Sequence, residues 1–124
     1  MSSRRLNDLS PSFRERVFEF LARLTEARVP VIIIDTLRTQ IEQDEKVALG
    51  LSWTFHSKHQ DGLAIDICPY DIYQLHGPDK LKWDETELVW QNIGIIGQSC
   101  GLKWGVVSSS GKRKDLGHFE YIKD

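Results

Sequence analysis

The sequence predicts a small α+β domain, with an antiparallel sheet and helices packed on one side of it. Three observations support this fold class. Apolar residues recur at helical spacing over residues 11–28. The run over residues 31–35, VIIID, is short and β-branched, as in a buried strand. Residues 118–122, HFEYI, alternate between polar and apolar side chains, which is typical of a strand with two different faces.

The first half of the chain contributes two helices and one strand to this prediction. Ser10 and Pro11 form a typical helix start, and Pro30 ends the helix predicted for residues 11–28. The strand at 31–35 follows, and then a polar helix near 39–49 that stops at Gly50. Residues 51–62 lack periodicity and are predicted to form a loop.

The second half contributes three strands and one helix. Residues 63–68 form a predicted strand ended by Pro69, and a loop covers 70–83. Asp84 and Glu87 resemble a capping box at the start of the third helix, which Gly101 ends. Strands at 102–107 and 118–122 flank a turn at 108–112. The predicted order is therefore α, β, α, β, α, β, β.

Length and composition limit the possible classes of protein. The 124 residues fit one domain, which we expect to span 1–124 as a monomer. Sixteen Lys and Arg against eighteen Asp and Glu give a net charge of −2, which argues against nucleic-acid binding. No apolar run approaches a membrane span, and the N-terminus has no secretory signal, so we expect synthesis in the cytoplasm. Cys68 and Cys100 are expected to be free thiols.

The residues with the clearest chemistry lie in two distant segments. His59 precedes Asp66 by seven residues, with Gly62 allowing a turn between them, and Asp66 interrupts an apolar strand where an unpaired charge would be costly. Imidazole and carboxylate groups are both good zinc ligands, and His118 could supply a third. Three protein ligands leave a position for water, whose proton the nearby Asp115 could accept.

Each of these residues also has an ordinary structural interpretation. Taken singly, His59 could be a surface histidine, Asp66 a cap or ion-pair partner, and His118 a half-buried core residue. His56 is a less favoured ligand, because only His59 stands in register with Asp66. Glu120 lies on the same strand face as His118. It could orient that histidine behind the metal, which we favour, or replace Asp115 as the base.

Two motifs together resemble a known family of zinc peptidases. Residues 57–66, SKHQDGLAID, resemble the S-x-H-x-x-G-x-A-x-D signature of the D-Ala-D-Ala carboxypeptidase and L-alanyl-D-glutamate endopeptidase family. Residues 115–120, DLGHFE, resemble its [DE]-x-x-H-x-E segment. The segments TLRT at 36–39 and GLKWG at 101–105 are similar to its arginine turn and to the stretch before its second metal segment. The resemblance implies a fold like that of these peptidases and of the hedgehog signalling domain.

The resemblance also implies roles for individual residues. His59, Asp66 and His118 would bind Zn²⁺, and Asp115 would be the general base that later protonates the leaving amine. Arg38 would bind the substrate carbonyl or stabilise the oxyanion. The remaining expected roles concern the substrate groove: Ser57 orients the metal loop or contacts substrate, and Trp104 lines the groove.

Aspartate at position 115 is similar to the phage endolysin branch, which cuts the L-alanyl-D-glutamate bond of peptidoglycan stem peptides. The resemblance therefore implies a phage or prophage endolysin that reaches the cell wall after release by a holin. The alternatives are a D-Ala-D-Ala carboxypeptidase or dipeptidase, and a zinc-bearing binding module without catalysis. The sequence departs from many members after Trp104-Gly105, and either Gln40 or Gln43 could take the place of the glutamine that follows the arginine turn.

Overall fold

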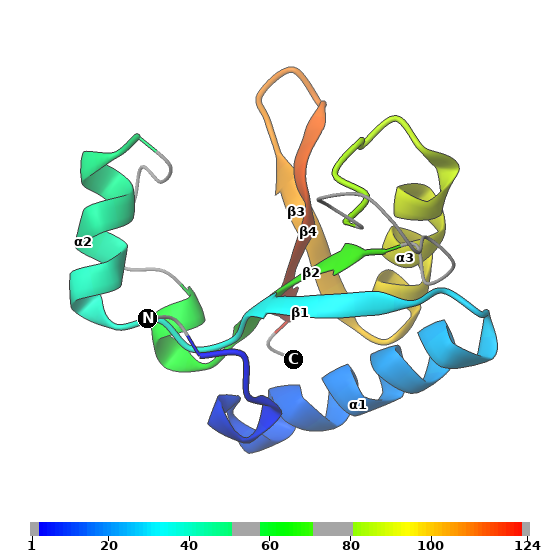
Figure 1. Cartoon of the computed structure of the whole chain (residues 1–124), viewed down its shortest axis with the longest axis horizontal. Helices are drawn as coiled ribbons and strands as arrows, with labels where there is room; N and C mark the ends of the chain where they lie inside the picture. The colour runs from blue at the N-terminus through cyan, green and yellow to red at the C-terminus, as the bar shows by residue number, and fades with distance from the viewer. Residues whose placement is uncertain (1–2, 51–57, 71–80, 123–124) are drawn as a thin grey trace.

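A computed structural model describes residues 3–50, 58–70 and 81–122 of the chain. Two 3-10 turns, three helices and four strands follow one another (Figure 1). In chain order they are η1 (Leu6–Asp8), α1 (Pro11–Glu26), β1 (Val31–Asp35), α2 (Gln40–Ala48), η2 (Lys58–Asp61), β2 (Ala64–Pro69), α3 (Leu88–Ser99), β3 (Leu102–Val107) and β4 (Arg113–Tyr121). The predicted order of helices and strands is confirmed.

The four strands form one antiparallel sheet in the order β1-β2-β4-β3. β2 and β4, which are far apart in sequence, lie next to each other, and their register pairs Asp66 with His118. Because side chains alternate across a strand, Asp66, His118 and Glu120 share one face of the sheet. The topology therefore joins the two sequence segments that carry the candidate ligands.

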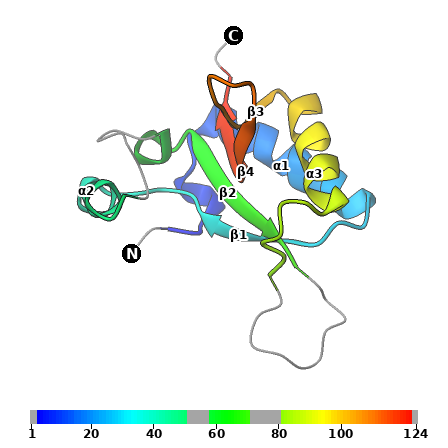
Figure 2. The same cartoon turned by 90° about the horizontal axis from the view of Figure 1, so that it is seen from above.

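The opposite face of the sheet carries the hydrophobic core. Ile65 of β2 and Phe119 of β4 are register partners, are fully buried, and lie in the same cluster as the apolar side of α1. The helices α1 and α3 pack there, and in Figure 2 both lie on the same side of the sheet. The core residues that they supply are Phe13, Val17, Phe20 and Leu24 of α1 and Trp90 and Ile93 of α3. The predicted fold class, with helices on one side of an antiparallel sheet, is confirmed.

Helix α2 differs from the other two because it lies beyond the end of β1 instead of on the core face (Figures 1 and 2). Its N-terminus is a capping box: the Thr39 hydroxyl accepts from the Glu42 amide, and the Glu42 carboxylate accepts from the Thr39 amide. Its one buried residue is Gln43, whose side chain accepts a hydrogen bond from Arg38. Helix α2 therefore contributes Gln43 to the site described below and no residue to the hydrophobic core.

Three details differ from the sequence-based expectations. The capping box predicted at Asp84 is wrong, because its carboxylate accepts from the amide and hydroxyl of Thr86 in a local turn, and α3 begins only at Leu88. The last strand begins at Arg113 instead of residue 118. The sequence did not predict this earlier start because the added segment is irregular and its side chains do not alternate simply. The turn η1 was not predicted at all.

Both cysteines are buried free thiols, as expected. Within the described residues, no helix has the length and apolar character needed to cross a membrane.

Candidate metal centre

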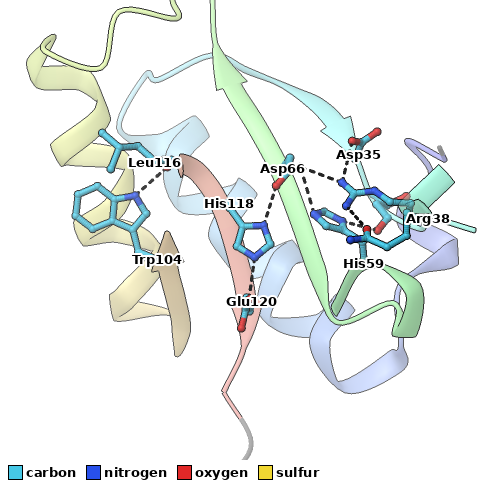
Figure 3. Close-up of polar contacts among 10 residues, drawn as sticks. Asp35, Arg38, His59, Asp66, Trp104, Leu116, His118 and Glu120 are labelled. Atoms are coloured by element: carbon cyan, nitrogen blue, oxygen red, sulfur yellow. Dashed lines mark hydrogen bonds and ion pairs between the residues drawn. The ribbon is translucent and has the colours of Figure 1, made fainter. Parts of the chain in front are cut away.

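His59, Asp66 and His118 meet at one point on the sheet face opposite the core (Figure 3). One ligand atom from each of the three side chains lies within 4.8 Å of the other two. Asp66 stands in the middle: its Oδ2 is 3.2 Å from His59 Nε2, and its Oδ1 is 2.9 Å from His118 Nδ1. The structure thus brings together the three residues predicted as ligands.

The backbone of the preceding segment fixes the orientation of His59. Its Nδ1 is 3.0 Å from the carbonyl oxygen of Thr36, and its own carbonyl accepts from the amide of Arg38. A carbonyl only accepts hydrogen bonds, so Nδ1 carries the hydrogen, and in the neutral ring Nε2 presents a lone pair. Nε2 faces a carboxylate oxygen of Asp66, so the contact is favourable with a proton on Nε2 or with a metal cation in the place of that proton. The donor chemistry fits zinc, with Nε2 as the ligand atom of His59.

His118 lies between two carboxylates. Its Nδ1 faces Asp66, while its Nε2 is 2.9 Å from Glu120 Oε1 on the same strand. Burial works against the charged ring, but the hydrogen bonds to Asp66 and Glu120 raise the pKa of His118 to about 10. The hydrogen bond from His118 likewise lowers the pKa of Glu120. Glu120 therefore stands where it can hold the His118 tautomer that leaves Nδ1 toward a metal, the role that the sequence favoured.

Asp66 is held as an anion although it is largely surrounded by protein. Burial opposes its charge, yet the hydrogen bonds and positive charges of His118 and His59 outweigh burial and keep the pKa of this carboxyl far below its ordinary value. Its side chain remains 23% exposed, so the cluster is not sealed. An accessible centre leaves room for a substrate, as a catalytic zinc site requires.

Arg38 lies on the far side of Asp66 from His118 and is almost completely buried. Its guanidinium donates to Gln43 Oε1 at 2.8 Å and lies 3.4 Å from Asp35 Oδ2 and 3.8 Å from Asp66 Oδ2. Of the two glutamines left open by the sequence, Gln43 is the one bonded to Arg38. Asp35 was not predicted as a site residue; an acidic side chain ending a strand, opposite Asp66 in the register, was the available signal.

Asp115 approaches the cluster from an irregular part of β4. Its backbone has a φ of 55°, in the left-handed region that non-glycine residues seldom adopt. Partial burial of the carboxyl, and then the negative charge of Asp66, raise the pKa of Asp115, while His118 and His59 act in the opposite direction. This electrostatic coupling to all three cluster residues is consistent with a group that faces the same small space.

The remaining predicted residues stand apart from the cluster. Trp104 is buried, and its indole nitrogen donates a hydrogen bond to the carbonyl of Leu116 at 2.8 Å. Its role in substrate binding stays a prediction. Ser57, like His56, lies outside the described residues.

The fold and this donor set define a zinc metallopeptidase. The chain belongs to the D-alanyl-D-alanine carboxypeptidase family, whose model matches residues 50–121, more than half of the chain. No curated protein is significantly similar to it in sequence.

Solved structures show the same fold. The L-Ala D-Glu endopeptidase ChiX of Serratia marcescens superposes with a TM-score of 0.74 at 21% identity, over 98% of this chain and 89% of its own. VanYB in complex with D-alanine-D-alanine gives 0.62 at 18% identity, over 93% and 72% of the two chains. A mutant of the vancomycin-resistance D,D-pentapeptidase VanY in complex with Zn(II) gives 0.60 at 18% identity, over 93% and 73%.

Proposed function

We propose that this protein is a zinc-dependent peptidoglycan peptidase that hydrolyses the L-alanyl-D-glutamate bond of the stem peptide. The observation that carries the proposal is the His59–Asp66–His118 cluster, with Asp115 three residues before His118 on the same strand. The similarity to ChiX, which is named an L-Ala D-Glu endopeptidase, supports this bond over others, because it extends over nearly the whole length of both chains. We propose a single catalytic domain over residues 1–124.

In this proposal His59, Asp66 and His118 hold the zinc ion, with Glu120 orienting His118. Zinc supplies a Lewis acid that polarises the scissile carbonyl and lowers the pKa of water. Asp115 accepts a proton from the attacking water while the oxygen of that water forms a bond to the carbonyl carbon. When the carbon–nitrogen bond breaks, Asp115 returns that proton to the leaving amine. The second proton of the water then leaves the new carboxyl group for the amine or for solvent, which gives a new carboxylate and a new amino terminus.

Arg38 supports the reaction through its charge. Its side chain is buried beside Asp66, where a fixed cation acts more strongly than in water. We propose that it stabilises the negative charge that develops on the carbonyl oxygen. Gln43 and Asp35 hold the guanidinium plane in place, so its position does not depend on the substrate.

A second function is favoured by two of the comparisons. The matching family is described as D-alanyl-D-alanine carboxypeptidase, and VanYB is solved with D-alanine-D-alanine. On the same scaffold this chain could therefore remove D-alanine from the stem terminus. A phage or prophage origin, with holin-dependent release from the cytoplasm to the wall, stays a prediction, as do Ser57 and Trp104 in substrate binding.

Product analysis separates these functions. The purified protein, loaded with zinc, is incubated with peptidoglycan and with isolated stem peptides, and the products are identified by mass. A new D-glutamate amino terminus is expected, whereas free D-alanine would favour the carboxypeptidase. Activity that survives complete removal of zinc would contradict both.

Asp115→Asn is the matching active-site variant, with Glu26→Gln on the exposed side of α1 as its control. The control removes a carboxylate of the same charge far from the cluster and should leave the rate unchanged. If the wild-type protein binds zinc and peptidoglycan but yields no product, the non-catalytic binding module is favoured instead.

A further inference from the structure

The strand β4 contains a long, irregular bulge that carries both the candidate base and a candidate ligand. Trp104 of β3 pairs with Phe119, and Val106 pairs with Lys114. The four residues 115–118 of β4 therefore stand opposite Gly105 alone. Asp115 is the first residue of this bulge and His118 the last, so the shape of the bulge sets the position of one relative to the other.

Gly105 leaves the space that the bulge needs. Its φ of 63° lies in the left-handed region, and a Cβ at this position would meet the carbonyl oxygen of Lys114 at 2.5 Å. The backbone of β4 at Lys114 therefore passes directly over the α-carbon of Gly105 in β3. Within the bulge Asp115 also takes a left-handed backbone conformation, which costs free energy unless neighbouring contacts impose it.

The indole of Trp104 supplies such a contact. Its Nε1 donates to the carbonyl oxygen of Leu116 at 2.8 Å in a buried setting. In the described part of the sheet, Leu116 has no register partner in β2 or β3. The indole N–H therefore holds the Leu116 carbonyl at a point where the register between β3 and β4 is interrupted.

The indole ring itself is held on both sides. A Cβ at Gly94 of α3 would lie 2.2 Å from the ring, so the helix approaches the indole as closely as its backbone allows. The Arg113 guanidinium carbon lies 4.3 Å from the ring centroid. Trp104 is 4% exposed, which leaves almost no surface for a substrate. The ring is anchored to the core and presents its N–H to the bulge.

We propose that Trp104 is a positioning residue for Asp115. Its indole N–H holds the Leu116 carbonyl, and this bond fixes the bulge and hence the distance between the Asp115 carboxyl and the zinc ligands. The inference rests on the proposed function, in which Asp115 is the general base. Trp104 then sets the position of the base, whereas the sequence analysis expected it to line the substrate groove.

Trp104→Phe tests the proposal, because it keeps an aromatic ring and removes the N–H. Trp90→Phe is a matched control for packing: Trp90 is buried in the same core and its ring lies against Gly117 of the bulge, but its indole nitrogen makes no hydrogen bond within the described residues. Both variants lose the same volume, so a loss caused by packing alone would appear in both. Zinc affinity, kcat and KM are measured for each, together with amide NMR spectra of the zinc-free proteins.

For Trp104→Phe we expect kcat to fall by about 10²-fold, as expected for a reacting group displaced by about 1 Å. KM and zinc affinity should stay near wild type, and the amide resonances of Asp115 and Leu116 should shift. Trp90→Phe, which changes packing against the bulge without removing a hydrogen bond, should keep a kcat near wild type and give smaller shifts at these two positions.

The inference is overturned if Trp104→Phe keeps the wild-type kcat, or if Trp90→Phe loses as much. The NMR comparison needs no activity, so it also decides the matter if the wild-type protein proves to have no peptidase activity. In that event the proposed function fails, and unshifted Asp115 and Leu116 resonances in Trp104→Phe would separately refute the positioning role.

Discussion

The two sides of the candidate site are built in different ways. On the side of η2 and β2, charged and polar side chains hold one another: Asp66 contacts His59, His118 and Arg38. On the side of β3 and β4, the backbone of a bulge presents Asp115, supported by a glycine and a buried indole. The first side should therefore respond to charge, pH and metal, and the second to changes of volume and backbone freedom.

Removing a ligand should have the largest effect. His118→Ala takes one nitrogen from the cluster and leaves Asp66 and Glu120 as neighbouring carboxylates without their shared partner. We expect zinc binding to be lost and peptidase activity to fall to background. Zinc content by mass spectrometry and the rate on peptidoglycan measure both. Chelated wild-type protein that regains activity with added zinc is the control, and an active His118→Ala protein would refute the ligand assignment.

Asp115→Asn should separate the two sides of the site. The amide cannot accept the proton from water, so kcat should fall by about 10³-fold. Zinc affinity should remain near wild type, because Asp115 is not among the three ligands. Titration with a zinc indicator and steady-state kinetics on the stem peptide check this. A protein that loses zinc in parallel with activity would instead make Asp115 a ligand.

Arg38→Lys should cost about 10²-fold in kcat/KM, the scale of losing one donor to an oxyanion. Lysine keeps the positive charge but cannot reach Gln43 and Asp35 as a planar fork. Kinetics of the purified variant provide the measurement. Arg23→Lys is the matched control, since its ion pair with Glu19 is exposed and should contribute little. Equal effects of the two substitutions would deny Arg38 a special role.

Two glycines distinguish backbone strain from the shape of the bulge. Gly111→Ala places a side chain in open space at a left-handed φ, which should cost about 1 kcal/mol of the free energy of unfolding. Gly105→Ala adds a collision with the Lys114 carbonyl, so we expect a loss of at least about 2–3 kcal/mol and lower activity. Urea unfolding compares them, and equal losses would mean that the bulge tolerates a Cβ.

The charged side of the site should also give the zinc-free protein a pH-dependent stability. The raised pKa of His118, about 10 against 6.5, gives stability that is complete below pH 6.5 and lost as the pH rises toward 10. The lowered pKa of Asp66 gives stability that is present above pH 3.8 and lost as the pH falls. The zinc-free protein should therefore be most stable between pH 3.8 and pH 6.5.

Urea unfolding of zinc-free protein over a pH series measures this curve. In His118→Ala the decline on the alkaline side should flatten, and an unchanged decline would show that another group causes it. Zinc must displace the proton on Nδ1 of His118, so binding should release about one proton, which calorimetry in buffers of different ionisation enthalpy detects.

Much of the fold follows from local patterns. The spacing of Phe13, Val17 and Phe20 predicts the buried side of α1, and the β-branched run predicts β1 with the observed bounds. Local competition explains the failure at Asp84, whose carboxylate bonds Thr86 instead of capping α3. The start of β4 was missed because a bulge removes the alternation by which strands are recognised.

The sequence by itself determined the chemistry of the site: two imidazoles and a carboxylate at recognisable spacing, a carboxylate three residues before the second imidazole, and a balanced charge of −2. Only the tertiary structure decided which partners these groups meet. Long-range strand pairing sets Asp66 opposite His118 and Trp104 beside the bulge, and the placement of α2 beyond β1 selects Gln43 as the partner of Arg38. Local spacing encodes helices and turns, whereas register between distant strands depends on the packing of the whole sheet against α1 and α3.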